Sequence, residues 1–322
     1  MKNIYFHNNG RGYISLLLLL FFTTLHVSAH QDTLRRNTSI EFQLFAKAGF
    51  NDEKSKTIDF DHHIDRTLLV YKQSLSNKFL FCLAGDSYSK NKEKPYELRP
   101  FLKRVYIQYH NKKMSLTGGL LVLEQFKYQR KLWRLIYIEK TFQYKCKYGD
   151  NRNVGVLMKY KLSNRFSYDV ALTSGFSTPS KDSHEKYTVM TGQTFNAGQW
   201  GIRFFNSVSV NPYFSHVISL FVAKQLQNGV LGLELANKTS DNKQTKEDKL
   251  GASVFGNYHF TKSLMCFARY DVNKQQCDRS AVNVIYAGVE HAFKDVIHAS
   301  VFYKKKFSHA NFYGVALLVA CF

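Results

Sequence analysis

The chain has 322 residues, of which 44% are hydrophobic and 15% aromatic, and its 45 Lys and Arg against 24 Asp and Glu give a net charge of +21. A charge of this size is typical of nucleic-acid-binding proteins. The chain begins with an export signal, described below, and an exported protein rarely meets nucleic acid. Lipopolysaccharide and small anionic solutes are therefore the favoured partners. The five cysteines include no CxxC pair, so they indicate neither a disulfide framework nor a zinc site.

The first segment has the form of a secretory signal peptide. Lys2 and Arg11 precede an apolar stretch from Tyr13 to about Leu25, which is followed by Val27, Ser28 and Ala29. We predict cleavage after Ala29. An uncleaved membrane anchor is the alternative, but about 13 apolar residues fall short of the roughly 20 that a spanning helix needs.

The remaining residues, 30–322, are predicted to form one all-β domain. Beyond Arg36 the dominant period is two, which is typical of strands with one apolar and one polar face. The first strand shows this pattern clearly, with Ile40, Phe42, Leu44, Ala46, Ala48 and Phe50 alternating with Glu41, Gln43, Phe45, Lys47 and Gly49. In chain order the candidate strands are 39–50, 64–73, 78–87, 101–110, 113–122, 151–162, 165–175, 187–196, 198–208, 214–225, 229–238, 247–260, 263–272, 281–293, 295–305 and 311–322.

The connections favour a membrane barrel over a water-soluble sandwich, which would also give alternating strands. Turns of a few residues, such as 163–164, alternate with longer polar connections, such as 88–100 and 273–280. That alternation is typical of outer-membrane barrels with periplasmic turns and external loops. We therefore predict a closed antiparallel transmembrane β-barrel of sixteen strands, within a range of 14 to 18, in the bacterial outer membrane.

The last candidate strand carries an apolar face and ends in an aromatic residue. Phe312, Gly314, Ala316, Leu318 and Ala320 alternate up to the terminal Phe322. A terminal strand of this form resembles the signal that the outer-membrane barrel assembly machinery reads, so that machinery is a predicted partner.

The longest connection, residues 123–150, follows the fifth strand and is strongly basic. We predict that it enters the barrel lumen and narrows it; an external loop that binds lipopolysaccharide phosphates is the alternative. Cations in a pore raise the local anion concentration. The candidate anion-binding residues of this loop are Lys127, Arg130, Lys131 and Arg134.

Six strands also carry a cation on the predicted lumenal face. We therefore expect the wall, like the loop, to favour anions. These candidate pore-lining residues are Lys47, Arg104, Lys159, Arg203, Arg269 and Lys304. The alternative is that lumenal acids neutralise them. The candidate acids are Glu41, Asp169, Glu234 and Asp271.

Two further site types receive little support. The cluster Asp59, Asp61, His62, His63 and Asp65 holds metal-ligating residue types, but neighbours on an extended chain point in opposite directions, so we predict a solvated rim beside the first external loop and no metal site. The sequence contains neither GxSxG nor HExxH. We predict no cofactor and no enzymatic activity, with an outer-membrane hydrolase as a minor alternative.

Four segments resemble members of the phosphate-selective porin O and P family. They are 132–143 (LWRLIYIEKTFQ), 153–156 (NVGV), 169–175 (DVALTSG) and 268–271 (ARYD). The resemblance implies a passive porin for small hydrophilic solutes, with anion preference and phosphate as hypotheses. General porins with this strand plan are often trimers, so a homotrimer is a further hypothesis. A non-conducting barrel that serves as an adhesin, receptor or structural anchor is the main alternative.

Overall fold

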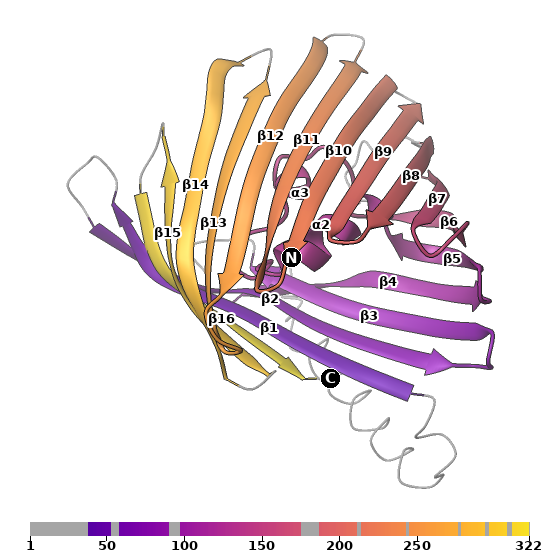
Figure 1. The fold of residues 1–322 in the computed structure, drawn as a ribbon, viewed down its shortest axis with the longest axis horizontal. Coiled ribbons are helices and arrows are strands. Elements are labelled where there is room, and N and C mark those ends of the chain that lie inside the picture. Colours follow the sequence, from indigo (N-terminus) through magenta and orange to yellow (C-terminus); the bar gives the residue numbers. More distant parts are fainter. Residues whose placement is uncertain are drawn as a thin grey trace, which may run out of the picture.

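The computed structural model describes residues 38–52, 58–89, 97–174, 187–210, 214–242, 245–275, 278–293, 296–307 and 311–321. The predicted signal peptide and the terminal Phe322 lie outside these residues. Sixteen antiparallel strands form a single closed barrel in which each strand pairs with its neighbours in the sequence. The barrel closes where β1 pairs with β16, from Phe42 opposite Cys321 to Asp52 opposite Asn311. The prediction of a sixteen-stranded barrel is confirmed (Figure 1).

The first eight strands are β1 (Thr38–Asp52), β2 (Ile58–Ser74), β3 (Phe79–Ser89), β4 (Leu98–His110), β5 (Met114–Val122), β6 (Arg152–Lys161), β7 (Phe166–Ser174) and β8 (Tyr187–Ala197). The second eight are β9 (Trp200–Val210), β10 (Phe214–Leu226), β11 (Gly229–Asn242), β12 (Thr245–His259), β13 (Leu264–Gln275), β14 (Asp278–Phe293), β15 (Ile297–Lys306) and β16 (Asn311–Cys321). Several strands are longer than predicted. The polar connection expected at 273–280 is wrong, because β13 continues to Gln275 and β14 already begins at Asp278.

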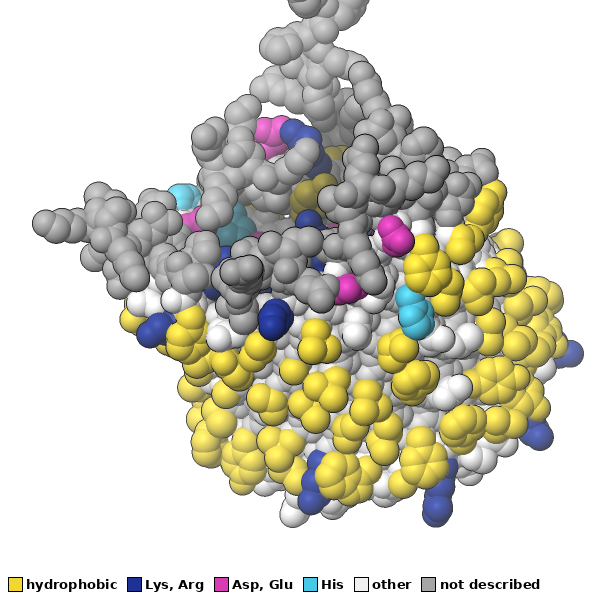
Figure 2. Space-filling view, turned by 90° about the horizontal axis from the view of Figure 1, so that it is seen from above, with side chains coloured by type: hydrophobic (Ala, Val, Ile, Leu, Met, Phe, Trp, Pro, Cys, Tyr) yellow, Lys and Arg dark blue, Asp and Glu magenta, His cyan; other side chains and the backbone are white. Residues whose placement is uncertain are grey.

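Alternation along each strand separates a lumenal face from an outer face. On β9, Arg203 and Phe205 are buried toward the lumen, whereas Trp200 and Phe204 point outward and are exposed. Figure 2 shows hydrophobic side chains covering the visible outer wall in a broad band, with Lys and Arg along its edges. Closure of the barrel pairs the backbone of each strand with its two neighbours, and the apolar outer band gives the wall a lipid-facing surface; a membrane-spanning sheet requires both.

Three register shifts are present among the described strands, and two of them, in β2 and β4, change which side chains face the lumen. β2 shifts against β1 opposite Phe45 and Ala46, and β4 shifts against β3 opposite Ala84 and Gly85. A bulge of this kind inserts one extra residue and redirects the side chains next to it. As a result, Asp65 and Arg66 both reach lumenal partners.

One end of the barrel, which we call the short-turn rim, carries the turns at 75–78, 111–113, 162–165, 198–199 and 227–228. The connection between β5 and β6 leaves the opposite end and folds back into the ring of strands (Figure 1). This segment, residues 123–151, is called the lumen loop below. It contains the 3-10 helix η2 (Glu124–Phe126) and the helices α2 (Lys127–Trp133) and α3 (Phe142–Lys145).

β16 shows how the lumen loop changes the pattern of the wall. Phe312, Ala316 and Leu318 face the lumen and pack in the buried cluster around the lumen loop. Tyr313 and Val315 point outward and are about half exposed. Both faces of β16 are therefore apolar, because one meets the membrane and the other meets the lumen loop.

Candidate functional site

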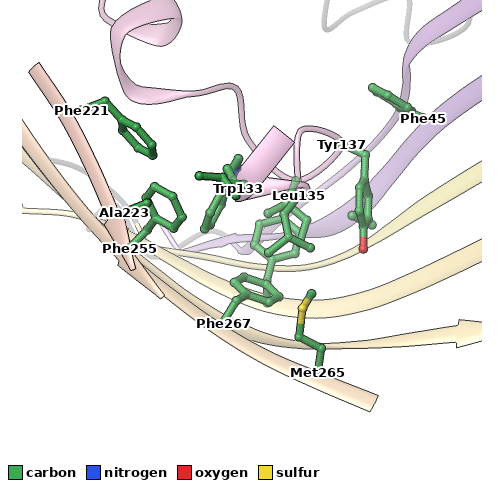
Figure 3. Packing of buried hydrophobic residues seen from close by; sticks show 13 residues of the cluster. Phe45, Trp133, Leu135, Tyr137, Phe221, Ala223, Phe255, Met265 and Phe267 are labelled. Carbon is green, nitrogen blue, oxygen red and sulfur yellow. The ribbon is translucent and has the colours of Figure 1, made fainter. Parts of the chain in front are cut away.

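The lumen loop is anchored by aromatic side chains against the inner faces of β10, β12 and β13. The Trp133 ring lies edge-on to Phe255 at 5.4 Å and to Phe267 at 6.1 Å between ring centroids (Figure 3). The Trp133 Nε1–H donates to the carbonyl oxygen of Glu139 at 2.9 Å, so its one polar group is satisfied. Tyr128 adds a third aromatic contact between the lumen loop and the wall by packing edge-on against Phe221. Edge-to-face pairs contribute about 1 kcal/mol each beyond the area they bury.

Ion pairs on the same side of the lumen are nearly balanced in charge. The guanidinium of Arg269 contacts both carboxylate oxygens of Asp271, at 2.7 and 2.9 Å. Lys145 from α3 reaches the same carboxylate at 3.1 Å. Arg269 also donates to the backbone carbonyl of Lys140 at 2.6 Å, which ties the wall directly to the lumen loop.

Glu139 supplies the corresponding acid from the lumen loop. Its carboxylate accepts from the Tyr286 hydroxyl at 2.8 Å and lies 3.2 Å from the Lys304 ammonium. Burial alone would raise the pKa of Glu139, but Lys304, Lys145 and the other nearby cations outweigh burial and hold the pKa well below its usual range. Glu139 is therefore ionised and pairs with the cations of this wall.

Tyr137 makes the third polar anchor. Its hydroxyl contacts the carboxylate of Glu290 and the hydroxyl of Ser300, both on the inner wall. The second oxygen of Glu290 lies 3.2 Å from His298 Nδ1. Burial raises the pKa of the Tyr137 phenol, and the adjacent Glu290 carboxylate raises it further, so the phenol remains a neutral donor. We call the inner wall formed by β10 to β16 and β1, together with these anchors, the docking side.

The opposite wall holds more cations than acids. Asp86 on β3 accepts from the Arg66 Nε at 2.9 Å and also contacts the ammonium of Lys103. Arg104 lies beside them, and its Nε is buried without a hydrogen-bond partner. Arg130 approaches from α2, where burial and the positive charges of Arg66 and Arg104 lower its pKa to about 10. Two cations thus contact the Asp86 carboxylate, and Arg104 and Arg130 add two further positive charges to the same group.

Cations also outnumber acids in a cavity of about 490 Å³ that lies between α2 and strands β5 to β9, next to the short-turn rim. Glu124 on η2 contacts Lys127 and lies 2.7 Å from Lys159. Burial alone would raise the pKa of Glu124, but these two ammonium groups hold it below its usual value. Across the cavity, Arg203 forms a bidentate pair with Asp169, with contacts of 2.8 and 3.1 Å. We call the wall of β2 to β9, with this cavity, the cationic side.

The structure places the six predicted wall cations on the lumenal face, but on different sides of the lumen. Lys47, Arg269 and Lys304 lie on the docking side and pair with Asp65 of the adjacent β2, with Asp271 and with Glu139, in that order. Lys159 and Arg203 lie beside the cavity and pair with Glu124 and Asp169. Arg104 belongs to the group around Asp86. The predicted neutralisation by Asp169 and Asp271 therefore applies to Arg203 and Arg269.

The four candidates from the lumen loop also separate. Lys127 pairs with Glu124, and Arg130 joins the group around Asp86. Lys131 is exposed and lines the cavity, whereas the exposed Arg134 follows α2 with a φ of 61°. The sequence interpretation missed Arg66 and Lys103, because the bulges turn them toward the lumen against the strict alternation assumed for the strands.

The predicted rim cluster near residue 60 is also placed differently. His62 and His63 lie within β2 and not in a loop, because this strand begins six residues earlier than predicted. His63 bonds to Asp61 and Asp65 at 3.2 and 2.8 Å. Among the described residues, no group of three or more His, Cys, Asp or Glu is arranged to hold a metal ion. Within the same residues, no helix has the length and apolar character needed to span a membrane.

Comparison with solved structures identifies the fold. The chain is similar to OmpT of Vibrio cholerae in its trimer form (TM-score 0.62, 10% identity, 88% of this chain and 100% of that one). It is also similar to OmpF of Salmonella typhi in complex with daunomycin (0.68, 10%, 88% and 98%) and to an anion-selective porin from Comamonas acidovorans (0.67, 9%, 88% and 100%). No family model matches the chain, and no curated protein matches it.

These similarities support a porin-like barrel. At about 10% identity they establish the fold and leave the solute open. The predicted bacterial outer-membrane location agrees with the outer apolar band and with barrels of this fold. The resemblance to the phosphate-selective porin O and P family remains a prediction.

Proposed function

We propose that this protein is an outer-membrane porin through which small hydrophilic solutes diffuse, with a preference for anions. The observation that carries the proposal is the excess of positive charge on the cationic side of the lumen. Around Asp86, the cations Arg66, Lys103, Arg104 and Arg130 stand against one carboxylate. Permeation involves no chemical step, so the proposed role is not enzymatic.

The physical basis is the field inside a narrow, low-dielectric opening. Cations that lack a carboxylate partner attract mobile anions, and confinement between the lumen loop and the wall strengthens this attraction over that in bulk water. The docking side contributes little to this field because its cations pair with Asp271, Glu139 and Asp65. Anions are therefore expected to pass along the cationic side. Phosphate is one candidate among them, because of the family resemblance.

The test is the reversal potential of the purified full-length barrel in a planar bilayer under a potassium chloride gradient. Anion preference predicts a reversal potential with the sign of the chloride equilibrium potential. The preference is expected to weaken as ionic strength rises, since salt screens the lumenal charges. A reversal potential of the opposite sign would refute anion preference.

A non-conducting barrel is the second candidate, and the packing of the lumen loop favours it. Leu135, Tyr137 and Phe142 are almost completely buried, so the lumen loop fills the docking side as a protein core would. Such a barrel would act as an adhesin, receptor or anchor. The same bilayer experiment separates the two, because a plugged barrel inserts without producing conductance steps.

The proposed function also implies partners and an assembly. Lipopolysaccharide and the outer-membrane lipid surround the apolar band, and the barrel assembly machinery inserts the chain. A homotrimer is the assembly we expect, in line with the trimer form of the Vibrio cholerae barrel. Crosslinking of the protein in native outer membranes tests this, and a monomer after crosslinking would contradict it.

A further inference from the structure

We infer that the cavity between α2 and strands β5 to β9 is a binding site for a small organic solute that carries at least two negative charges together with hydroxyl groups, such as a sugar phosphate. This inference rests on the proposed function and narrows it. It assigns solute recognition near the short-turn rim to a defined group of residues rather than to the average charge of the lumen.

The charge of the cavity requires a multiply charged ligand. The lysines that line it are Lys112, Lys113, Lys127, Lys131, Lys159 and Lys161. Together with Arg203, these lysines carry seven positive charges. The lining holds two acids, Glu124 and Asp169, so five positive charges are in excess. Both acids are already engaged, since Glu124 contacts two of the lysines and Asp169 is paired with Arg203. A ligand with one negative charge would leave most of this excess uncompensated.

The lysines differ in how freely they can reach a ligand. Lys127 and Lys159 are held by Glu124 on the lumen-loop side of the cavity. Lys112 and Lys113 are exposed on a turn of the short-turn rim, Lys161 is exposed at the end of β6, and Lys131 is exposed on α2. Among the residues that the structure describes, none of these four ammonium groups pairs with a carboxylate, so each can form a charge-assisted hydrogen bond with a phosphate or carboxylate oxygen of a ligand.

Neutral polar groups on the same wall supply the second part of the recognition. Asn196 lines the cavity, and because its Oδ1 accepts from the Tyr128 hydroxyl at 2.7 Å, its amide N–H groups are not used in that bond. Thr194 accepts from Arg203 at 2.9 Å and keeps its own hydroxyl proton. Ser115 and Ser167 add further hydroxyls. Groups that both donate and accept hydrogen bonds suit the hydroxyls of a sugar or hydroxy acid.

The size of the cavity also favours an organic solute. At about 490 Å³ it falls within the range of about 300–1,000 Å³ that is typical of small-molecule sites. Inorganic phosphate would reach only some of the lysines and would leave the hydroxyl groups to water. A phosphorylated sugar can contact the lysines and the polar wall at the same time.

The experiment measures how solutes block the chloride current of the full-length barrel. Glucose 6-phosphate, inorganic phosphate and glucose are added in turn on the side of the short turns. Glucose 6-phosphate is expected to half-block the current at about one tenth of the concentration required for inorganic phosphate, and glucose is expected to have no effect. A tenfold ratio corresponds to about 1.4 kcal/mol, the scale of one additional charge-assisted hydrogen bond.

The double variant Lys131→Gln/Lys161→Gln is expected to raise the half-blocking concentration of glucose 6-phosphate about tenfold. The matched control Lys140→Gln/Lys147→Gln also removes two exposed lysines, both from the lumen loop and neither lining the cavity. It is expected to leave the block unchanged. Calorimetric titration of the detergent-folded barrel with glucose 6-phosphate gives a second measurement that does not require conductance.

The outcomes separate this inference from the proposed function. An anion-selective reversal potential combined with equal block by both phosphates, or with no effect of the Lys131/Lys161 variant, would overturn the binding site and leave the anion porin standing. A cation-selective or silent barrel would overturn the porin proposal. In that case, calorimetric binding that is lost in the Lys131/Lys161 variant would still support the site, and no binding would reject it.

Discussion

The two sides of the lumen contain similar residue types, but on the docking side these residues hold the lumen loop and on the cationic side they leave an excess of positive charge. On the docking side, cations meet acids in nearly equal number, and apolar rings fill the space between wall and lumen loop, as around Trp133. On the cationic side, Arg66 and Lys103 share the Asp86 carboxylate, and Arg104 and Arg130 add positive charge beside them. The docking side is packed and charge-balanced like a protein core, whereas the cationic side presents an excess of positive charge to the lumen.

The number of lumenal cations therefore does not determine the electrostatic field in the lumen. Arg269 and Arg203 are equally buried, and each is neutralised by a carboxylate within 3 Å. Arg130 has a similar position in the lumen, but the charges nearest to it include Arg66 and Arg104. Selectivity should therefore depend on a few unpaired groups, and loop position should depend on the paired ones.

The largest expected effect is that of Trp133→Ala on the docking side. Removing the indole leaves a cavity beside Phe255 and Phe267, and a loss of this kind costs about 4 kcal/mol. The lumen loop is then expected to leave the wall. Single-channel conductance should rise several-fold, and residues 127–145 should become accessible to trypsin.

The control for this variant is Trp200→Ala, which removes an outward-facing indole that is 48% exposed at the short-turn rim. This change is expected to leave conductance as it was. An unchanged conductance in Trp133→Ala together with unchanged trypsin resistance would show that the aromatic contacts do not hold the lumen loop.

The next effect is that of Asp86→Asn on the cationic side. The change leaves Arg66 and Lys103 without their carboxylate, and breaking a buried ion pair in this way costs about 3 kcal/mol. The temperature at which the barrel unfolds, read from gel mobility after heating, should fall. The reversal potential should move further toward that of chloride, because one negative charge is lost where cations already dominate.

Asp241→Asn provides a matched change at an exposed carboxylate on β11. It is expected to alter neither the unfolding temperature nor the reversal potential by a comparable amount. Equal shifts in the two variants would mean that the group around Asp86 has no special weight in selectivity.

The fold was predictable because its signals are local. Alternation over a few residues, as in 38–50, determines which side chains face the membrane, and short turns such as 163–164 determine which strands are neighbours. β16 shows the limit of this reasoning. Its even-numbered residues are apolar because of a loop more than 160 residues earlier in the chain, and nothing in the strand itself indicates that contact.

The candidate site was predictable only in part, because it depends on contacts between residues that are far apart in the sequence. The position of the lumen loop depends on contacts such as Tyr137 with Glu290, which are 153 residues apart. Which lumenal cation keeps its charge unpaired depends on distances across the barrel. Arg66 and Lys103 were missed because a bulge shifts side chains by one position, and no residue type marks such a bulge in the sequence.

A smaller effect is expected for Tyr137→Phe, which removes one hydroxyl from the docking side and keeps the ring. Ser300 and one oxygen of Glu290 lose a partner, at a cost of about 1 kcal/mol. In a Trp200→Phe background, Trp133 is the only tryptophan and its fluorescence reports docking. Its emission should shift at a lower urea concentration than in the parent, whereas Tyr313→Phe on the outer face should not change that midpoint.

The smallest effect is expected from mild acid, because the pKa of Glu139 lies below its ordinary value of 4.5. The pKa of this carboxyl is lower in the docked loop than in an undocked one, so its contribution to docking is complete above that ordinary value. It is lost only as the pH falls toward the lowered value. Trp133 emission should therefore stay constant between pH 7 and 5 and change below about 4. Undocking near pH 6 would mean that a group other than Glu139 controls the docking side, and Glu139→Gln would then leave the transition in place.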